Sequence, residues 1–220
     1  MRDLIDKLES RYAWSSLEVD GYTWRWLDTA AGGPPVLLLP GPVGDGAMCV
    51  RTLLSLGERL RLIAATYPEI ADPKQLAAGL KAVVGHLGLP PSVVVGSSFA
   101  AYWAQFFALA YPEHVRKLVV GNGFTDASDL ADNPLFDPQW VVATPPKELH
   151  ATWLAKVQSA PASPLQQLQK LMLEQRQSPE NLHARFVGVA RSYACPPLPL
   201  KPADIVVLHC DDGPLIPPPA

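Results

Sequence analysis

Hydrophobic residues occur along the chain in short continuous runs, separated by longer segments with a helical period. Continuous apolar runs are typical of strands covered on both faces of a parallel sheet, whereas half-exposed strands alternate apolar and polar positions. Four runs predict such strands, at 36–39, 93–95, 118–120 and 205–208. The stretch 61–68 is a weaker fifth candidate. The pattern therefore indicates a buried parallel sheet.

Helix signals lie between these runs. Asp72 followed by Pro73 is typical of an N-cap with proline at the first helical position. The apolar stripe that follows, ended by Gly88, consists of Leu76, Leu80, Val83, Val84 and Leu87. After Ser98, alanines recur every four residues, at 100, 104 and 108. One side of that helix therefore carries only small side chains, which let it pack tightly on a sheet.

The segment 15–30 predicts two strands joined by an Asp-Gly turn at Asp20 and Gly21, a hairpin at the edge where the chain enters the sheet. Downstream of it, strand and helix patterns alternate. This order predicts a doubly wound α/β fold with a mostly parallel sheet and right-handed crossovers.

Residues 127–203 interrupt the alternation and are rich in proline and glutamine. Two helices are predicted to open with Ser-Pro pairs at Ser163 and Ser178, and Gln166 stands in the capping-box position of the first. Each helix has an apolar stripe that we expect to pack on the body of the protein. The stripes are Leu165, Leu168, Leu171 and Met172, and then Leu182, Phe186, Val189 and Tyr193.

The chain has 220 residues, 48% of them hydrophobic, which is enough for one domain with a small lid. We therefore predict a core formed by 1–126 and 204–220, and a helical lid at 127–203 inserted between the sixth and seventh strands.

Charge and cysteine content exclude several classes of function. A net charge of -3 and a pI near 5.9 leave no basic patch for nucleic acid. Cys49, Cys195 and Cys210 are far apart and lack CxxC spacing, so we expect reduced, buried thiols rather than disulfides or a zinc site. We predict no cofactor and no metal. The chain shows neither a signal peptide nor a transmembrane segment, which indicates a soluble cytoplasmic protein.

The stretch VVVGSSFAAYWAQ, residues 93–105, predicts a nucleophile elbow, because a Gly-Ser-Ser-Phe-Ala turn follows a strand and opens a helix. In such a turn the serine is strained, and the residues two before and two after it must be small. Gly96 and Ala100 satisfy this requirement around Ser98. Ser98 is therefore the candidate nucleophile, and the amide of Phe99 is one candidate oxyanion donor.

From about Trp24 onward the chain resembles the α/β-hydrolase fold superfamily, and within it the maspardin-like branch. The stretches that carry the resemblance are WRWLDTA, LLLPGPVGDGAMCVRTLLSL, VVVGSSFAAYWAQFFA, LVVGNGFTDAS and KPADIVVLHCDD. The branch is indicated by LPGPVG, where most hydrolases have His-Gly, and by GNGFTDAS. The resemblance implies Ser98 as nucleophile and Asp212 as the triad acid, with Asp211 beside it and Asp126 as the fallback. An ordinary turn after a strand explains the Asp-Asp-Gly sequence equally well.

The triad histidine is the member that this chain lacks at the expected place. In this fold the histidine comes last, in a loop after an eighth strand. The chain ends at Ala220, and no histidine follows Asp212. We therefore expect that the C-terminal strand and helix are missing, and that the general base is absent or is one of five histidines elsewhere. These are His86 and His114 away from the strand tips, His209 on the seventh strand, and His150 and His183 on polar faces of the lid helices.

The oxyanion loop departs from the superfamily pattern as well. Its second amide is expected from the residue after the His-Gly pair, which here is Pro42, and proline has no N–H. Val43 or Gly44 would have to replace it through a rearranged loop.

Two functional hypotheses follow. The first is a non-catalytic protein that acts through a protein partner, or through self-association along the exposed seventh strand, whose edge would lack a neighbour. The second is a serine hydrolase that cleaves a small carboxylic ester through Ser98, with a base from the lid or from a second chain. An incomplete chain from a longer or damaged gene is a third explanation of the missing histidine.

Overall fold

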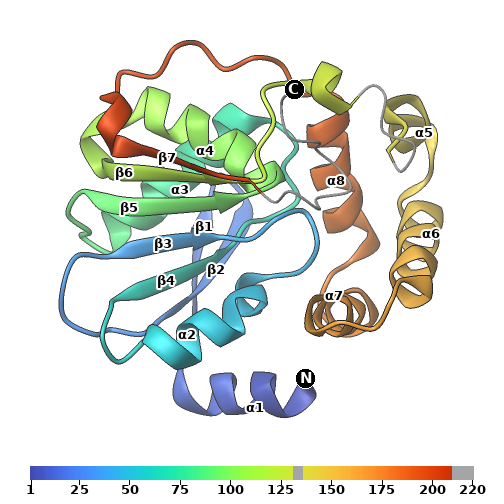
Figure 1. Cartoon of the computed structure of the whole chain (residues 1–220), viewed down its shortest axis with the longest axis horizontal. Coiled ribbons are helices and arrows are strands. Elements are labelled where there is room, and N and C mark those ends of the chain that lie inside the picture. The colour runs from blue at the N-terminus through green and yellow to red at the C-terminus, as the bar shows by residue number, and fades with distance from the viewer. Residues whose placement is uncertain (131–135, 210–220) are drawn as a thin grey trace.

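The computed structural model describes residues 1–130 and 136–209. Its described part contains a seven-stranded mixed sheet of order β1-β2-β4-β3-β5-β6-β7 (Figure 1). The strands are β1 (Trp14–Val19), β2 (Tyr22–Asp28), β3 (Val36–Leu39), β4 (Leu62–Thr66), β5 (Ser92–Ser97), β6 (Val115–Gly121) and β7 (Ile205–Leu208). All five predicted apolar runs are strands, so the prediction of an α/β sheet is confirmed.

The sheet is antiparallel at its β1 edge and parallel from β4 to β7. β1 pairs antiparallel with β2, and β2 pairs antiparallel with β4. Every other pairing is parallel, from β4 through β3, β5 and β6 to β7. The predicted hairpin is confirmed, because Asp20 and Gly21 both have positive φ, 51° and 80°. Two such residues form the type I′ turn that suits the twist of a hairpin.

Eight α-helices are described. They are α1 (Arg2–Arg11), α2 (Val50–Leu56), α3 (Pro73–His86), α4 (Phe99–Ala110), α5 (Pro138–Ala143), α6 (Pro146–Ser159), α7 (Pro164–Gln175) and α8 (Pro179–Ala190). The Asp72 carboxylate caps α3 by accepting from the amides of Lys74 and Gln75. Ser163 and Ser178 cap α7 and α8 in the same way. The predicted helix starts at these three sites are therefore confirmed.

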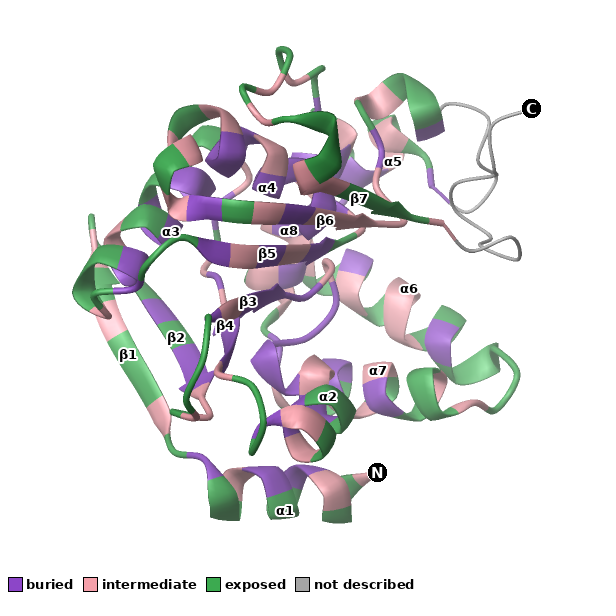
Figure 2. Ribbon diagram, turned by 60° about the vertical axis from the view of Figure 1, so that its left-hand side comes forward, coloured by how far each residue is buried: buried purple, intermediate pink, exposed green. Residues whose placement is uncertain are grey.

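The hydrophobic core lies around the central strands of the sheet. Buried residues concentrate in the central strands, whereas the edge strands β1 and β7 carry many exposed residues (Figure 2). The three spaced alanines of α4 are all fully buried. The largest buried side chains in the described part include Trp24, Trp103, Tyr67 and Tyr102.

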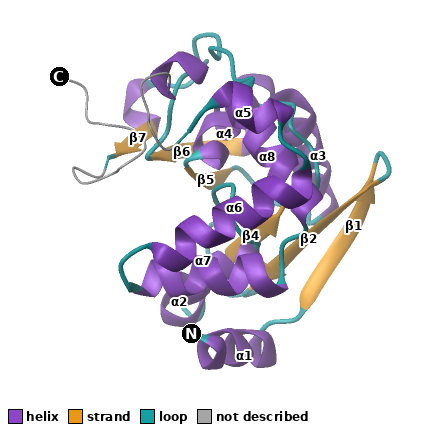
Figure 3. Ribbon diagram, turned by 90° about the vertical axis from the view of Figure 1, so that its right-hand side faces the viewer, coloured by secondary structure: helices purple, strands orange, loops and turns teal. Residues whose placement is uncertain are grey.

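Helices α5–α8 follow β6 and precede β7 in the chain, and they lie together beyond the carboxyl ends of the central strands (Figures 1 and 3). They occupy most of the segment predicted as a lid, and its assignment as a separate domain stays a prediction. Both apolar stripes are buried only in part, because Leu165 is 58% exposed and Tyr193 is 41% exposed. Tyr193 also lies beyond the end of α8.

Two further details of the sequence prediction are wrong. The Gln166 side chain does not complete a capping box, because its Nε2 donates to the Val157 carbonyl of the preceding helix. Cys49 and Cys195 are free thiols but are only partly buried, and Cys210 lies outside the described residues. No described helix is long and apolar enough to cross a membrane.

Candidate active-site cleft

Ser98 lies in the sharp turn between β5 and α4, with φ of 52° and ψ of -120°. This conformation is rare for a residue with a side chain and costs on the order of 1–3 kcal/mol. The surrounding backbone holds it in place. The Ser98 amide donates to the Gly121 carbonyl at 2.9 Å, and its carbonyl accepts from the Tyr102 amide at 3.1 Å. The turn thus stands where the sequence predicts it.

The close approach expected around this turn is present. A Cβ added to Gly96 would lie 2.5 Å from the Ala100 carbonyl oxygen and 2.8 Å from the Cα of Ala101. No real Cβ occupies such a space, so the strand can meet the helix only through glycine at this position.

Ser98 opens onto a small cavity of about 40 Å³. Every other described residue of its lining is apolar: Pro42, Phe124, Leu130, Phe136, Trp153, Phe186 and Val189. Trp153 and Phe186 pack edge to face in its wall, with ring centroids 4.5 Å apart. The serine hydroxyl therefore faces an environment that favours an apolar group.

All five histidines lie within the described residues, and none lines this cavity. His86 ends α3 against the Trp26 ring, and His114 precedes β6 beside Glu113. β7 ends at Leu208, so His209 follows the strand rather than lying on it. His150 and His183 do not lie on freely solvated faces, because their Nε2 atoms are buried without a hydrogen-bond partner.

The candidate triad acids are not brought to Ser98 by any described contact. The Asp126 carboxylate accepts from the amide and the hydroxyl of Ser128, at the start of the short 3₁₀ helix Ala127–Leu130. Asp126 also does not line the cavity. Asp211 and Asp212 lie outside the described residues.

The loop that the sequence predicts as the oxyanion loop passes directly beside Ser98. A Cβ added to Gly41 would lie 3.6 Å from the Ser98 Cβ, and the next residue, Pro42, lines the cavity. Phe99 provides the first amide of α4, which has no acceptor within the helix. At the position predicted for the second oxyanion donor, the loop therefore has a residue without an N–H.

Gln177, in the turn between α7 and α8, binds both sides of this loop. Its Oε1 accepts from the Gly44 amide at 2.8 Å, and its Nε2 donates to the Pro42 carbonyl at 2.8 Å. The Gly44 amide is thus already engaged. In a trans peptide the N–H points away from the C=O, so the Val43 amide is directed away from Gln177. Val43 is buried, 5% exposed.

Arg185 of α8 holds the same loop from the interior. Its guanidinium donates to the Gly44 carbonyl at 2.6 Å and to the Tyr67 carbonyl at 2.8 Å. It also lies over the Tyr67 ring, 3.9 Å from the centroid. Arg185 is fully buried, and this burial lowers its pKa. No carboxylate of the described chain lies within ion-pair distance of it.

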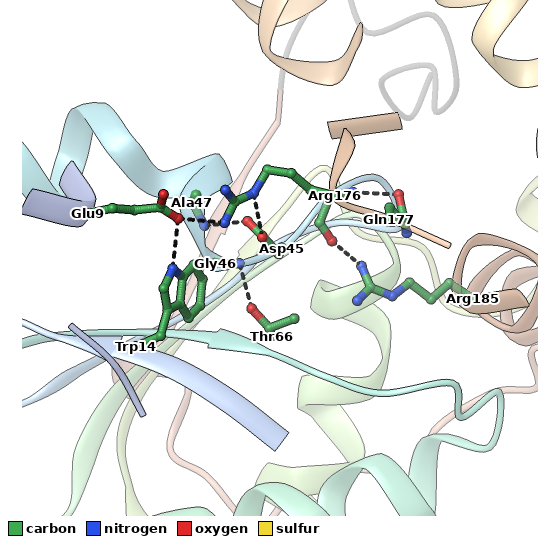
Figure 4. Close-up of polar contacts among 10 residues, drawn as sticks. Glu9, Trp14, Asp45, Gly46, Ala47, Thr66, Arg176, Gln177 and Arg185 are labelled. Atoms are coloured by element: carbon green, nitrogen blue, oxygen red, sulfur yellow. Dashed lines mark hydrogen bonds and ion pairs between the residues drawn. The ribbon is translucent and has the colours of Figure 1, made fainter. Parts of the chain in front are cut away.

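A second arginine ties the far end of the loop to α1 (Figure 4). Arg176 donates through Nε to Asp45 and through a terminal nitrogen to Glu9, both at 2.8 Å. Burial acts to lower the pKa of Arg176, but the two carboxylates outweigh it and raise the pKa. Glu9 in turn accepts from the Trp14 indole at 2.8 Å.

The sequence does not identify Gln177, Arg176 or Arg185 as part of the site. Arg185 alone leaves a signal, since it falls on the apolar stripe of α8 between Leu182 and Phe186, where a charged side chain needs a buried partner. Gln177 and Arg176 precede a helix cap and resemble ordinary surface residues.

No protein-family model matches the chain. Over 134 residues it is 28% identical to maspardin of Homo sapiens, and equally to maspardin of Macaca fascicularis. The match covers 60% of this chain and 43% of maspardin, so the chain spans less than half of the length of these relatives.

Solved structures share the fold at lower identity. A membrane phospholipase A, titled a novel bacterial virulence factor, has a TM-score of 0.72 and 20% identity, over 98% of this chain and 75% of that one. A thermophilic esterase from Thermogutta terrifontis has a TM-score of 0.69 and 20% identity, over 94% of this chain and 82% of the esterase. An N-acyl homoserine lactonase has a TM-score of 0.68 and 16% identity, over 93% of this chain and 80% of the lactonase. These values establish likeness in fold alone.

Proposed function

We propose, from the α/β-hydrolase fold of this chain, that it is a maspardin-like protein that acts by binding a protein partner and does not hydrolyse esters through Ser98. The lining of the Ser98 cavity carries this proposal. Among the described residues, the lining contains no histidine and no carboxylate. A serine hydroxyl is a weak nucleophile at neutral pH unless a base removes its proton.

The oxyanion loop supports the same proposal. Pro42 has no N–H to offer, and Gln177 occupies the amide of Gly44. Removal of one oxyanion donor costs about 3–4 kcal/mol of transition-state stabilisation in enzymes that use two. Catalysis by this cleft would therefore lack both the base and part of the electrostatic stabilisation.

The alternative is a serine hydrolase that acts on a small carboxylic ester. The strained conformation of Ser98 and the apolar cavity in front of it favour this alternative, because both are typical of an acyl-transfer site. It requires a base that comes from a moved lid or from a second chain.

The two functions differ in the reactivity of Ser98. We expect slow p-nitrophenyl acetate turnover that changes less than about threefold in Ser98→Ala, and weak fluorophosphonate labelling. The reason is that loss of a triad base lowers turnover by roughly 10⁶, which leaves only binding and oxyanion effects. Turnover and labelling are measured on purified wild type and variant side by side.

Ser97→Ala is the matched control, because Ser97 is the exposed neighbour of Ser98 on β5. Strong labelling that disappears in Ser98→Ala but persists in Ser97→Ala, with a turnover loss above about a hundredfold, would establish the hydrolase and reject the proposal.

We further propose the outer edge of β7 as an interaction surface for a second copy of the chain. Among the described residues, β7 pairs only with β6. Val206, Val207 and Leu208 are 39%, 69% and 55% exposed. Free N–H and C=O groups beside exposed apolar side chains form a template for strand pairing.

Self-association that grows with concentration is therefore expected in light scattering, and Val207→Lys is expected to reduce it strongly. A charge on an edge strand opposes pairing because it must be desolvated. Val142→Lys is the control, since this valine of α5 is also exposed, at 37%. A monomer at all concentrations up to about 1 mM, or equal effects of the two variants, contradicts the proposed surface.

A further inference from the structure

A second and larger cavity lies between the β1–β2 hairpin and α3, on elements that the Ser98 cleft does not use. Its volume is about 240 Å³. Its lining comes from the hairpin, from the segment before α3 and from one face of α3: Val19, Asp20, Tyr22, Trp24, Ile70, Gln75, Ala78 and Gly79.

The lining of this cavity includes the Trp24 indole, and the close approach of α3 to that ring requires glycine at 79. A Cβ added to Gly79 would lie 2.5 Å from three atoms of the Trp24 indole. Trp24 is 1% exposed, and its Nε1 is buried without a hydrogen-bond acceptor in the described chain. The indole is thus a buried part of the lining, with an Nε1–H that no described acceptor engages. Tyr22, 40% exposed, adds a second ring from the same strand.

The polar side chains on the hairpin and on α3 that line the cavity are available to bind a ligand. The side chains of Asp20, Tyr22 and Gln75 have no hydrogen-bond or ion-pair partner among the described residues. The described residues of the lining include one carboxylate and no lysine, arginine or histidine. Lys74, on the same helix, places its ammonium over the Tyr193 ring instead, 5.8 Å from the centroid.

We propose that this cavity binds a small organic ammonium ion carried on an aromatic or alkyl stem. The carboxylate of Asp20 attracts the charge, and ring faces attract cations through their quadrupole. Val19, Ile70 and Ala78 provide apolar surface for the stem. A mostly apolar cavity with a few convergent polar groups is the usual form of a small-molecule site.

Asp20→Asn tests the charge without disturbing the turn. Asp20 has φ of 51°, a conformation that asparagine adopts as readily, and Asn-Gly is the favoured pair for a type I′ turn. The variant removes the negative charge and keeps the shape of the hairpin. Ala78→Leu, at an exposed helix position, fills the cavity without replacing a buried residue.

The experiment is calorimetric titration of the whole chain with phenethylammonium, 2-phenylethanol and phenylacetate, which share a stem and differ in charge. We expect saturable binding of phenethylammonium with a dissociation constant of about 1 mM or tighter. Binding of the neutral and the anionic probe is expected to be at least about tenfold weaker. The indole Nε1–H resonance of Trp24 is expected to shift with the same saturation curve.

Asp20→Asn is expected to weaken phenethylammonium binding about tenfold, and Ala78→Leu to abolish it. Glu18→Gln is the control, because this carboxylate is on the same hairpin but does not line the cavity, and it is expected to change binding less than about twofold. Absence of saturable binding, or equal affinity of wild type and Asp20→Asn, would overturn the proposal.

Discussion

Replacing Gly96 with alanine is expected to lower the free energy of unfolding by about 3 kcal/mol, the upper end of the usual range for a side chain forced into a packed interior. The new Cβ would lie 2.5 Å from the Ala100 carbonyl oxygen and 2.7 Å from its carbonyl carbon. Both atoms belong to the backbone of α4, so relief requires that the helix move relative to β5. Urea denaturation followed by circular dichroism measures the change.

Gly85→Ala is the matched control for this substitution. Gly85 lies near the end of α3, and nothing stands within 4 Å of the Cβ it would gain. Since alanine is the better helix former, this variant is expected to be more stable than wild type by about 0.5–1 kcal/mol. A Gly96→Ala variant as stable as wild type would show that the turn at Ser98 is not closely packed.

The elbow was predictable because its causes are local. Three valines, a glycine and spaced alanines specify a buried strand, a close crossing and a helix that packs tightly, and each of these depends on residues within a short window. The hairpin at Asp20 and the caps at Asp72, Ser163 and Ser178 were predictable for the same reason, because each depends on a short polar side chain beside its own backbone.

The contacts that shape the oxyanion loop were not predictable, because they join residues more than 100 positions apart. Gln177 and Arg185 reach Pro42 and Gly44 across the fold, and neither spacing nor composition indicates the pairing. The same limit explains Gln166, whose position suits a capping box but whose amide reaches Val157 of the neighbouring helix. Tertiary contacts override a local preference of this size.

The histidines show how position along a chain differs from position in space. The sequence alone leaves open a base from α6 or α8, the helices that carry His150 and His183. Among the described residues, the α6 and α8 side chains that line the Ser98 cavity are the aromatic Trp153 and Phe186 together with Val189. Neither His150 of α6 nor His183 of α8 is among the described residues that line the cavity.

Arg185→Met is expected to lower the free energy of unfolding by about 2 kcal/mol. Loss of the guanidinium leaves the Gly44 carbonyl without its donor, and hydrogen bonds from a charged group contribute about 1.5–3 kcal/mol each. Part of that loss is recovered, because the variant no longer buries a charge that has no carboxylate beside it.

Urea denaturation measures the loss of stability. Amide exchange at residues 43–46 is expected to accelerate in Arg185→Met, since Arg185 and Gln177 together hold this loop. Arg191→Met, at the exposed end of α8, is expected to change neither measurement. Faster loop exchange without a change in Ser98 labelling would mean that the loop is held for the stability of the fold, as a binding protein requires, whereas a matching rise in labelling would mean that Arg185 restrains a catalytic site.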